Sequence, residues 1–202
     1  MKPNLKLNPK LSQVNLVKSK DLVLSNEKLN VEAMLQGDRV VVSGDLPLLQ
    51  SLHDKGWFGV IINGILELPL TEALYLLERG KISIIDKTRK ALSFNGFVRK
   101  AREVDIRFMT RYRVYADIRS KGYITKEALK YGADFSVYER GTTPEEEHSK
   151  WLLFAVSADE GFNWREFSAM NRVAHSVKKN LLIGILDSQA EVTYYEIRWV
   201  RP

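Results

Sequence analysis

The second half of the chain brings together three residue types that can cleave RNA. Tyr138 is followed ten residues later by His148, and the pair Lys178 and Lys179 comes after them. Metal-free RNA cleavage needs a base for the 2′-hydroxyl proton, an acid for the departing 5′-oxygen and a cation for the charged phosphorane. Histidine exchanges protons near neutral pH, whereas tyrosine is a poor base unless a nearby cation, here Lys179, favours its phenolate. These residues therefore indicate a metal-free ribonuclease centre.

Each of these residues also has an ordinary explanation when it is considered alone. A tyrosine at a strand end often lies on the rim of a sheet, and a histidine after three glutamates is often only a solvated loop residue. A lysine pair that closes a helix complements the negative end of the helix dipole. The hypothesis therefore depends on the three residue types occurring together.

The segments around Tyr138 and His148 indicate how these two residues are positioned. Apolar and polar residues alternate from Ala133 to Tyr138, which predicts a half-buried β-strand with Tyr138 on its polar face. The loop 139–147 contains a glycine and a proline, which are typical of turns, and it places His148 near its end. We therefore expect the histidine to be accessible to a substrate.

The residues before the lysine pair predict a helix. Apolar side chains recur there at near-helical spacing, so we expect one face of the helix to be buried. Arg172, Lys178 and Lys179 then fall elsewhere on the helix or at its end, where their charges face solvent or a ligand. The apolar positions are Phe167, Met170, Val173, Ala174 and Val177.

Three segments, in this order, resemble the catalytic half of the archaeal tRNA-splicing endonucleases: YGADFSVYERG, EEEHS and RVAHSVKKNLLIGILD. The likeness continues to the C-terminus through EVTYYEIRWVRP and backward through VYADIRSKGYITKEALKYGADF. It reaches more faintly to QGDRVVV and LTEALYLLERGKI, and so covers the chain from about Gln36 onward.

The resemblance implies a role for each residue of the centre. Tyr138 corresponds to the general base, His148 to the general acid and Lys179 to the residue that stabilises the transition state. The family has a basic residue before its catalytic lysine, which makes Lys178 that neighbour, but with two adjacent lysines the assignment could be one residue off. The implied substrate is precursor tRNA, cut at the bulge-helix-bulge element of the intron-exon junctions to leave 2′,3′-cyclic phosphate and 5′-hydroxyl ends.

The resemblance also implies which residues contact RNA. In the family an arginine seven residues before the catalytic lysine stacks on a bulged base, and Arg172 stands at that position. A second arginine near the C-terminus assists it, with Arg198 and Arg201 as the two candidates. We expect Lys178 to add a salt-sensitive contribution to RNA binding.

Association between subunits is implied as well. In the family an acidic loop of one subunit inserts into a polar groove of another, and the corresponding loop carries the carboxylates of Asp187 and Glu191. An ordinary polar hairpin tip is the alternative explanation of this loop. Family assemblies include homotetramers, dimers of double-length chains and heterotetramers with a structural subunit. This chain is too short to be double-length, and its intact centre and N-terminal lobe favour a homotetramer, with a separate structural partner left open.

A second hypothesis is that the chain is a non-catalytic, structural RNA-binding subunit of such an assembly. Family members with that role lose the catalytic triad, whereas Tyr138, His148 and Lys179 are all present here. The sequence therefore favours the catalytic hypothesis.

Composition limits the other functions of the 202-residue chain. Hydrophobic residues make up 45% of it, which is enough for a core that folds without disulfides. There is no cysteine, and the three histidines lack ligand spacing, so we expect no protein-held metal and no cofactor. The net charge of +6 suits a polyanionic partner such as RNA. No glycine-rich nucleotide-binding motif or paired-carboxylate pattern appears.

The sequence also bears on localisation. No apolar run approaches the ~20 residues of a membrane-spanning helix, and the N-terminus lacks the apolar centre of a signal peptide. We therefore expect a cytoplasmic protein.

The order of the predicted elements indicates a mixed α/β (α+β) fold in three parts. Residues 1–30 form a basic N-terminal extension, either a flexible arm or one added strand. Residues 31–92 form a small N-terminal α/β lobe. Residues 93–202 form the C-terminal catalytic domain, with a mixed central sheet flanked by helices.

Individual elements follow from local signals. Gly37 and Asp38 form a turn between two strands, and a later helix has Thr71 as its N-cap and ends before Gly80. Between residue 93 and Gly122, apolar positions that include Val104 step by three or four and predict one long helix or two abutting ones. The remaining predicted strands are 82–85 and 151–156, with a hairpin of 181–186 and 192–200.

Overall fold

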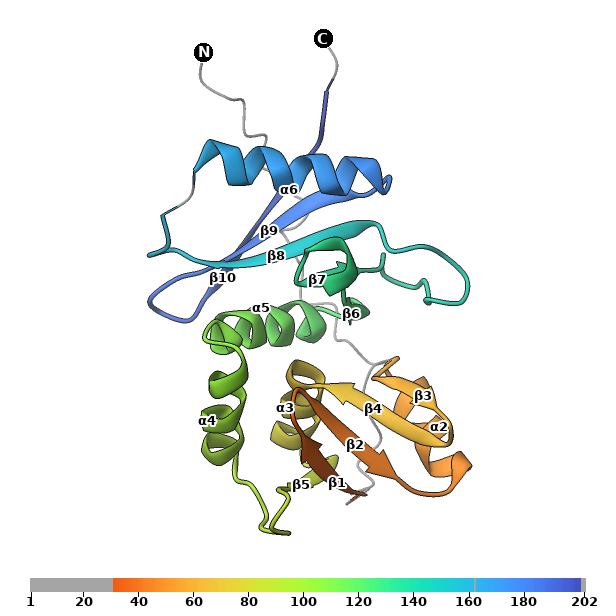
Figure 1. The fold of residues 1–202 in the computed structure, drawn as a ribbon. Helices are drawn as coiled ribbons and strands as arrows, with labels where there is room; N and C mark the ends of the chain where they lie inside the picture. The colour runs from red at the N-terminus through yellow and green to blue at the C-terminus, as the bar shows by residue number, and fades with distance from the viewer. Residues whose placement is uncertain (1–30, 162, 201–202) are drawn as a thin grey trace. The chain divides into compact units, whose positions relative to one another are not determined.

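The computed structural model describes residues 31–161 and 163–200, and the predicted mixed α/β fold is confirmed in them (Figure 1). The predicted extension 1–30 and Arg201 lie outside the described residues. The described chain divides into two compact units between Tyr112 and Arg113. The lobe boundary near residue 92 stays a prediction.

The first unit contains a five-stranded sheet in the order β3-β4-β2-β1-β5. The strands β1 and β5 are parallel, and the other neighbours in this sheet are antiparallel. Its strands are β1 Val31–Gln36, β2 Arg39–Ser43, β3 Val60–Ile62, β4 Ile65–Pro69 and β5 Ile82–Ile85. The helices of this part of the chain are α2 Leu46–Asp54, α3 Leu70–Glu78 and α4 Phe94–Val104.

The predicted turn between β1 and β2 is confirmed, and so are β5 and the helix α3. The N-cap of α3 was predicted wrongly. The cap position is Pro69, which makes no side-chain cap hydrogen bond, and Thr71 is buried inside the helix. The reason is that β4 runs directly into α3, so no polar loop residue separates the strand from the helix.

Two further elements of this unit have local sequence signals and were not predicted. Asp45 caps α2 by accepting a hydrogen bond from the backbone N–H of Leu48 at 3.3 Å. Asn63 and Gly64 join β3 to β4 with φ angles of 51° and 76°, which is the backbone that Asn-Gly favours in two-residue hairpin turns. Both signals are local and could have been read from the sequence.

The segment after residue 93 forms two helices, α4 and α5 Phe108–Ser120, so the two-helix alternative is confirmed. The carboxylate of Asp105 accepts the backbone N–H of Arg107 at 2.9 Å in the connection between them. Val104, one of the apolar positions of this segment, is 54% exposed because it is the last residue of α4.

The second unit contains a five-stranded sheet in the order β10-β9-β8-β7-β6. Only β8 and β9 are parallel neighbours in this sheet. Its strands are β6 Thr125–Glu127, β7 Phe135–Val137, β8 Trp151–Ser157, β9 Asn180–Leu186 and β10 Val192–Ile197. A short 3-10 helix, η1 Leu129–Tyr131, precedes β7, and the helix α6 Trp164–Ser176 connects β8 to β9. The predicted strand 151–156 and the C-terminal hairpin are confirmed, although β10 ends at Ile197.

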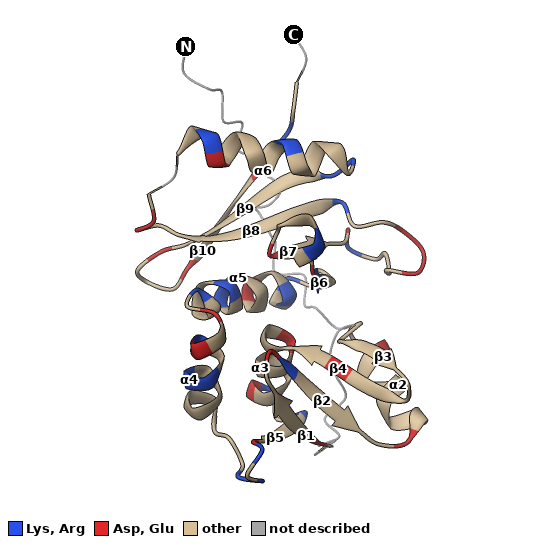
Figure 2. Ribbon diagram, in the orientation of Figure 1, with Lys and Arg blue, Asp and Glu red and all other residues tan. Residues whose placement is uncertain are grey.

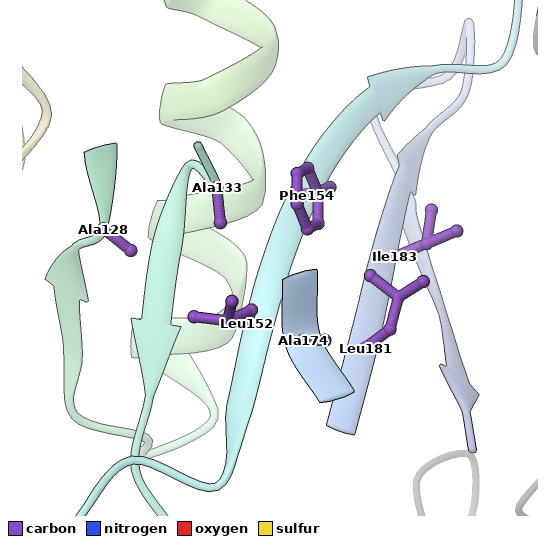
Figure 3. Packing of buried hydrophobic residues seen from close by; sticks show 7 residues of the cluster. All are labelled: Ala128, Ala133, Leu152, Phe154, Ala174, Leu181 and Ile183. Carbon is purple, nitrogen blue, oxygen red and sulfur yellow. The ribbon is translucent and has the colours of Figure 1, made fainter. Parts of the chain in front are cut away.

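One face of this second sheet packs against α6. Figure 3 shows the buried apolar cluster between them, in which Ala174 of α6 lies against β8 and β9. The predicted apolar face of the helix is confirmed, because its other apolar residues pack against the same cluster. The cluster consists of Ala128, Ala133, Leu152, Phe154, Ala174, Leu181 and Ile183.

The opposite face packs against the second half of α5. The hydroxyl of Tyr194 on β10 donates to the carbonyl oxygen of Val114 at 3.2 Å and to the carboxylate of Asp117 at 2.8 Å. Gly184 permits the close approach, since a Cβ added there would lie 2.7 Å from Cγ1 of Val114. The sheet is therefore covered on both faces.

The prediction of a half-buried strand before Tyr138 is wrong, because both faces of the sheet are covered. Residues 133–137 are all buried, including Asp134 and Ser136. Asp134 is accommodated because its carboxylate accepts the backbone N–H of Ala155 at 2.8 Å. Tyr138 follows the strand and is half-buried. None of the helices in the described part of the chain has the length and hydropathy of a membrane-spanning segment.

Candidate active site

The strand register brings the ends of three neighbouring strands together. Val137 pairs with Trp151, and Trp151 pairs with Asn180. The backbone N–H of Lys150 donates to the carbonyl of Val137 at 2.9 Å, and that of Asn180 donates to the carbonyl of Lys150 at 3.0 Å. Tyr138 at the end of β7 and Lys179 before β9 therefore flank the start of β8, which the segment containing His148 enters.

The two adjacent lysines lie in different environments because α6 ends just before them. The backbone N–H groups of Lys178 and Lys179 donate to the carbonyls of His175 and Ala174, at 3.0 and 2.9 Å. Lys178 has a φ of 56°, so the helix ends with a left-handed residue. Lys178 is exposed as a result, whereas Lys179 is partly buried.

Lys179 contacts the segment that carries the histidine. Its Nζ donates to the carbonyl oxygen of Ser149 at 2.7 Å, and Ser149 is the buried neighbour of His148. Burial is the main cause that lowers the pKa of Lys179; Tyr131 acts in the opposite direction, and Lys130 adds a smaller lowering. Of the two lysines, the geometry favours Lys179 as the cation of the site.

Tyr138 has a pKa shifted opposite to the direction expected from the sequence. Burial of the side chain raises the pKa of the phenol, and the nearby Tyr131 raises it further. The expectation was that Lys179 would favour the phenolate, which would lower the pKa. The shift that burial and Tyr131 cause is the reverse of this expectation, because burial disfavours the charged phenolate. The phenol therefore holds its proton in the free protein at neutral pH.

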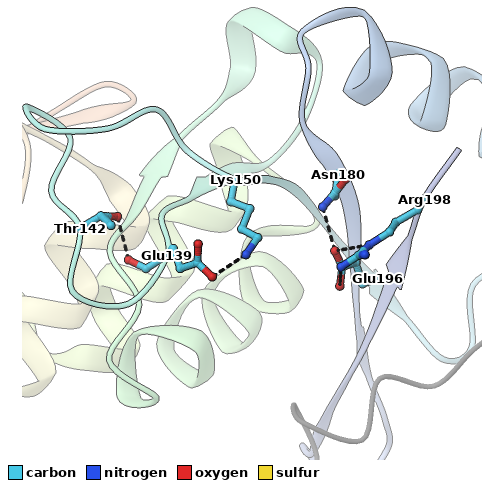
Figure 4. Close-up of polar contacts among 6 residues, drawn as sticks. All are labelled: Glu139, Thr142, Lys150, Asn180, Glu196 and Arg198. Atoms are coloured by element: carbon cyan, nitrogen blue, oxygen red, sulfur yellow. Dashed lines mark hydrogen bonds and ion pairs between the residues drawn. The ribbon is translucent and has the colours of Figure 1, made fainter.

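His148 is exposed, as expected, at the end of an anchored loop. Figure 4 shows Lys150 paired with Glu139 across the base of this loop, and the hydroxyl of Thr142 donates to the carbonyl of Glu139 at 2.9 Å. On the other side of His148, the next residue, Ser149, is buried. The imidazole is thus presented to solvent from a backbone fixed on both sides.

Lys130 and Tyr131 lie beside this site and were not predicted from the sequence. Both belong to η1, and the Lys130 Nζ lies 4.9 Å from the centre of the Tyr131 ring. Tyr131 influences the pKa of both Tyr138 and Lys179. No spacing signal indicates this, because η1 reaches the site through the packing of its domain. Figure 2 shows basic residues at the starts of β8 and β9 and beside β7.

The predicted RNA contacts differ in their surroundings. Arg172 is exposed on α6 and lines a hollow beside Trp199. Arg198 donates from Nε and one terminal nitrogen to the carboxylate of Glu196, at 3.1 and 3.3 Å, and this bond raises the pKa of its guanidinium (Figure 4). Asn180 donates to the same carboxylate at 2.8 Å.

One carboxylate of the acidic loop between β9 and β10 accepts hydrogen bonds within the loop. Oδ1 of Asp187 accepts the backbone N–H groups of Gln189 and Glu191 at 2.9 and 2.8 Å. Glu191 is exposed. The contact of this loop with another subunit stays a prediction. Within the described residues, no group of three or more histidine, cysteine, aspartate or glutamate side chains is arranged to hold a metal ion.

Two family profiles match the chain. Residues 31–98 match the "tRNA intron endonuclease, N-terminal domain", and residues 108–194 match the "tRNA intron endonuclease, catalytic C-terminal domain". The second match includes Tyr138, His148 and Lys179 and the strands whose ends position them.

Curated relatives agree with these matches. The chain is 42% identical over 171 residues to a tRNA-splicing endonuclease of Thermococcus onnurineus, covering 85% of this chain and 97% of the relative. It is 46% identical over 142 residues to that of Nanoarchaeum equitans, covering 67% and 90%. For the enzyme of Methanothermobacter thermautotrophicus the identity is 38% over 174 residues, covering 86% and 100%.

Proposed function

Because this chain belongs to the tRNA intron endonuclease family, we propose that it is a catalytic member that cleaves precursor tRNA at intron-exon junctions. The observation that supports this most is that Tyr138, the His148 segment and Lys179 lie together at the ends of the neighbouring strands β7, β8 and β9. Tyrosine, histidine and lysine supply a base, an acid and a cation, which are the requirements of metal-free cleavage.

In the proposed reaction the phenolate oxygen of Tyr138 takes the proton of the 2′-hydroxyl. The O2′ attacks phosphorus, the bond from phosphorus to the 5′-oxygen breaks, and the His148 imidazolium gives its proton to that oxygen. The products are a 2′,3′-cyclic phosphate and a 5′-hydroxyl. The Lys179 ammonium stabilises the extra negative charge of the phosphorane, and its bond to the Ser149 carbonyl holds it near the histidine segment.

The raised pKa of Tyr138 sets a condition on this reaction. Only a small fraction of the protein carries the phenolate at neutral pH, but the phenolate that forms is a stronger base than that of an ordinary tyrosine. Bound RNA adds further negative charge to the site, and the positive charges of Lys130 and Lys179 offset part of it.

The test is cleavage of a bulge-helix-bulge RNA by the purified protein in excess EDTA. We expect products that end in 2′,3′-cyclic phosphate and 5′-hydroxyl groups. Products with 5′-phosphate ends, or activity that disappears with EDTA and returns with a metal, contradict the proposed chemistry. A protein that binds the RNA but never cuts it is instead the structural subunit of the alternative hypothesis.

We also propose self-association, with a homotetramer as the expected form and the loop that carries Asp187 and Glu191 as a contact between subunits. The exposure of Glu191 supports this, because its carboxylate is available to a partner. Light scattering on the protein expressed alone distinguishes self-assembly from dependence on a separate structural subunit.

A further inference from the structure

The histidine segment, residues 139–150, has near each of its ends a cation that lies over an aromatic ring. The guanidinium carbon of Arg140 lies 4.8 Å from the ring centre of Tyr123. The Nζ of Lys150 lies 4.9 Å from the ring centre of Trp151. Both distances are within the ~6 Å at which the face of a ring attracts a cation. Each end of the segment is therefore held on a ring.

Tyr123 and Trp151 also contact each other and form one aromatic pair. Their ring centres are 6.0 Å apart and their planes lie at 80°, which is the favourable edge-to-face arrangement. Trp151 is the buried first residue of β8, and Tyr123 is partly buried. Because the surrounding domain fixes these rings, the pair offers the two cations a surface of defined orientation.

The aromatic pair is also tied to the strand that leads to Tyr138. The backbone N–H of Tyr138 donates to the carbonyl of Ile124, the residue after Tyr123, at 2.9 Å. Trp151 pairs with Val137, the residue before Tyr138. The backbone beside each ring thus contacts the segment of the proposed base, while the ring faces hold the histidine segment. The position of the acid relative to the base therefore depends on this pair.

The middle of the histidine segment is bonded to itself. The hydroxyl and the backbone N–H of Thr143 donate to the carboxylate of Glu146 at 2.9 and 3.2 Å. The backbone N–H of Glu146 donates to the carbonyl of Thr143 at 3.1 Å. Such a segment moves as a unit, so contacts with the rest of the domain set its orientation. The aromatic pair provides such contacts, and the bond from Lys179 to the Ser149 carbonyl provides another.

We propose that Tyr123 and Trp151 are positioning residues for His148. By holding the cations near the two ends of the histidine segment, they direct the imidazole toward the leaving 5′-oxygen. The proposal rests on the proposed ribonuclease reaction and deepens it, because it names the residues through which the acid is aimed. In this role the two rings touch neither the RNA nor the reacting atoms.

The experiment compares two RNAs that differ in their need for an acid. One is the bulge-helix-bulge RNA, and the other has sulfur in place of the leaving 5′-oxygen. A thiolate is a much weaker base than an alkoxide, so it leaves without a proton. Tyr123→Leu keeps an apolar side chain and removes the ring. It should slow single-turnover cleavage of the ordinary RNA roughly 5- to 50-fold, as expected for loss of one cation–π contact and one aromatic pair. The sulfur RNA should be cut at the wild-type rate.

Matched variants separate the ring from other effects. Tyr123→Phe keeps the ring and should cut both RNAs at the wild-type rate. Arg140→Ala removes one contact and should show a smaller loss on the ordinary RNA alone. Arg79→Ala removes a guanidinium that lies 3.3 Å from the ring centre of Tyr75 in the first unit, and it should change neither rate. Added to His148→Ala, Tyr123→Leu should cause no further loss, because the pair acts through the imidazole.

Three results for Tyr123→Leu overturn the proposal. They are an unchanged rate on the ordinary RNA, equal slowing of both RNAs, and a loss confined to RNA affinity in filter binding, which would assign the rings to substrate binding. His148→Ala is measured in parallel. If it slows both RNAs equally, the proposed acid fails, and the role of the pair fails with it. If sulfur restores the rate of His148→Ala but not that of Tyr123→Leu, only the positioning role fails.

Discussion

The Nζ of Lys179 donates a hydrogen bond to the carbonyl oxygen of Ser149 at 2.7 Å, and Ser149 follows His148 in the chain. This contact joins the segment after α6 to the segment before β8. The position of the cation and the position of the proposed acid are therefore set by one interaction. A change in either segment should disturb both functions of the site.

The lysine pair gives a matched test of the site. Lys179→Ala should lower the single-turnover rate by roughly 10²- to 10³-fold, as expected for loss of a group that stabilises transition-state charge. Lys178→Ala, with the exposed neighbour changed, should keep the rate and weaken RNA binding, with the salt slope reduced by about 1. If the two variants exchange phenotypes, the catalytic lysine has been assigned one residue off.

Replacing His148 separates catalysis from binding. His148→Ala should lower the cleavage rate by roughly 10²- to 10⁴-fold while RNA affinity changes little, because an acid acts on the leaving group mainly in the transition state. Rates come from single-turnover cleavage, and affinities from filter binding of uncleavable RNA. Equal losses of rate and affinity would show that the histidine holds the substrate and does not protonate the leaving oxygen.

The raised pKa of Tyr138 predicts a pH dependence. A base is active when deprotonated, so the phenolate fraction increases tenfold for each pH unit below the pKa. In the His148→Ala variant the residual rate should therefore climb with a slope near +1 from about pH 7 to about pH 9.5, without levelling off. Tyr138→Phe in the same background should abolish that slope. A residual rate that stays flat with pH would exclude Tyr138 as the base.

The acidic loop allows a test of assembly that leaves its turn intact. Asp187→Asn keeps an oxygen that can accept the N–H groups of Gln189 and Glu191, so it should preserve the loop. Glu191→Lys reverses an exposed charge and should dissociate the oligomer in light scattering and reduce cleavage. Arg172→Ala should lose cleavage while remaining fully assembled. Wild-type mass for Glu191→Lys at micromolar concentration would remove the loop from the subunit interface.

Gly184 tests the packing that covers the second face of the catalytic sheet. Gly184→Ala places a methyl group 2.7 Å from Cγ1 of Val114 and should lower the free energy of unfolding by about 1 to 3 kcal/mol. Val114→Ala should restore part of the loss in the double variant, because it removes the clashing methyl groups. Gly161→Ala, where nothing lies within 4 Å, serves as the control. Urea unfolding is measured for the wild type, the two single variants, the double variant and the control, and additive effects of the pair would argue against a direct clash.

Signals within a few positions of the chain were enough to predict most local elements and the residue types of the site. The apolar face of α6, the turn at Gly37 and Asp38 and the C-terminal hairpin depend on spacing and turn residues within a few positions, so they were predictable. Tyr138 and His148 were recognisable from linked segments of the chain. The signals for α2 and the β3–β4 hairpin were equally local and were overlooked.

The environment and the protonation of these residues depend on the packing of the folded domain. Which lysine turns inward depends on the left-handed end of α6, and the direction of the Tyr138 pKa shift depends on its burial and on Tyr131. The ring contact of His175 and Trp199 joins a helix to a segment 24 positions later in the chain. Such contacts are made between elements that are distant in the chain, and periodicity carries information only about near neighbours. Burial, pKa and the shape of a binding surface are therefore properties of the packed domain.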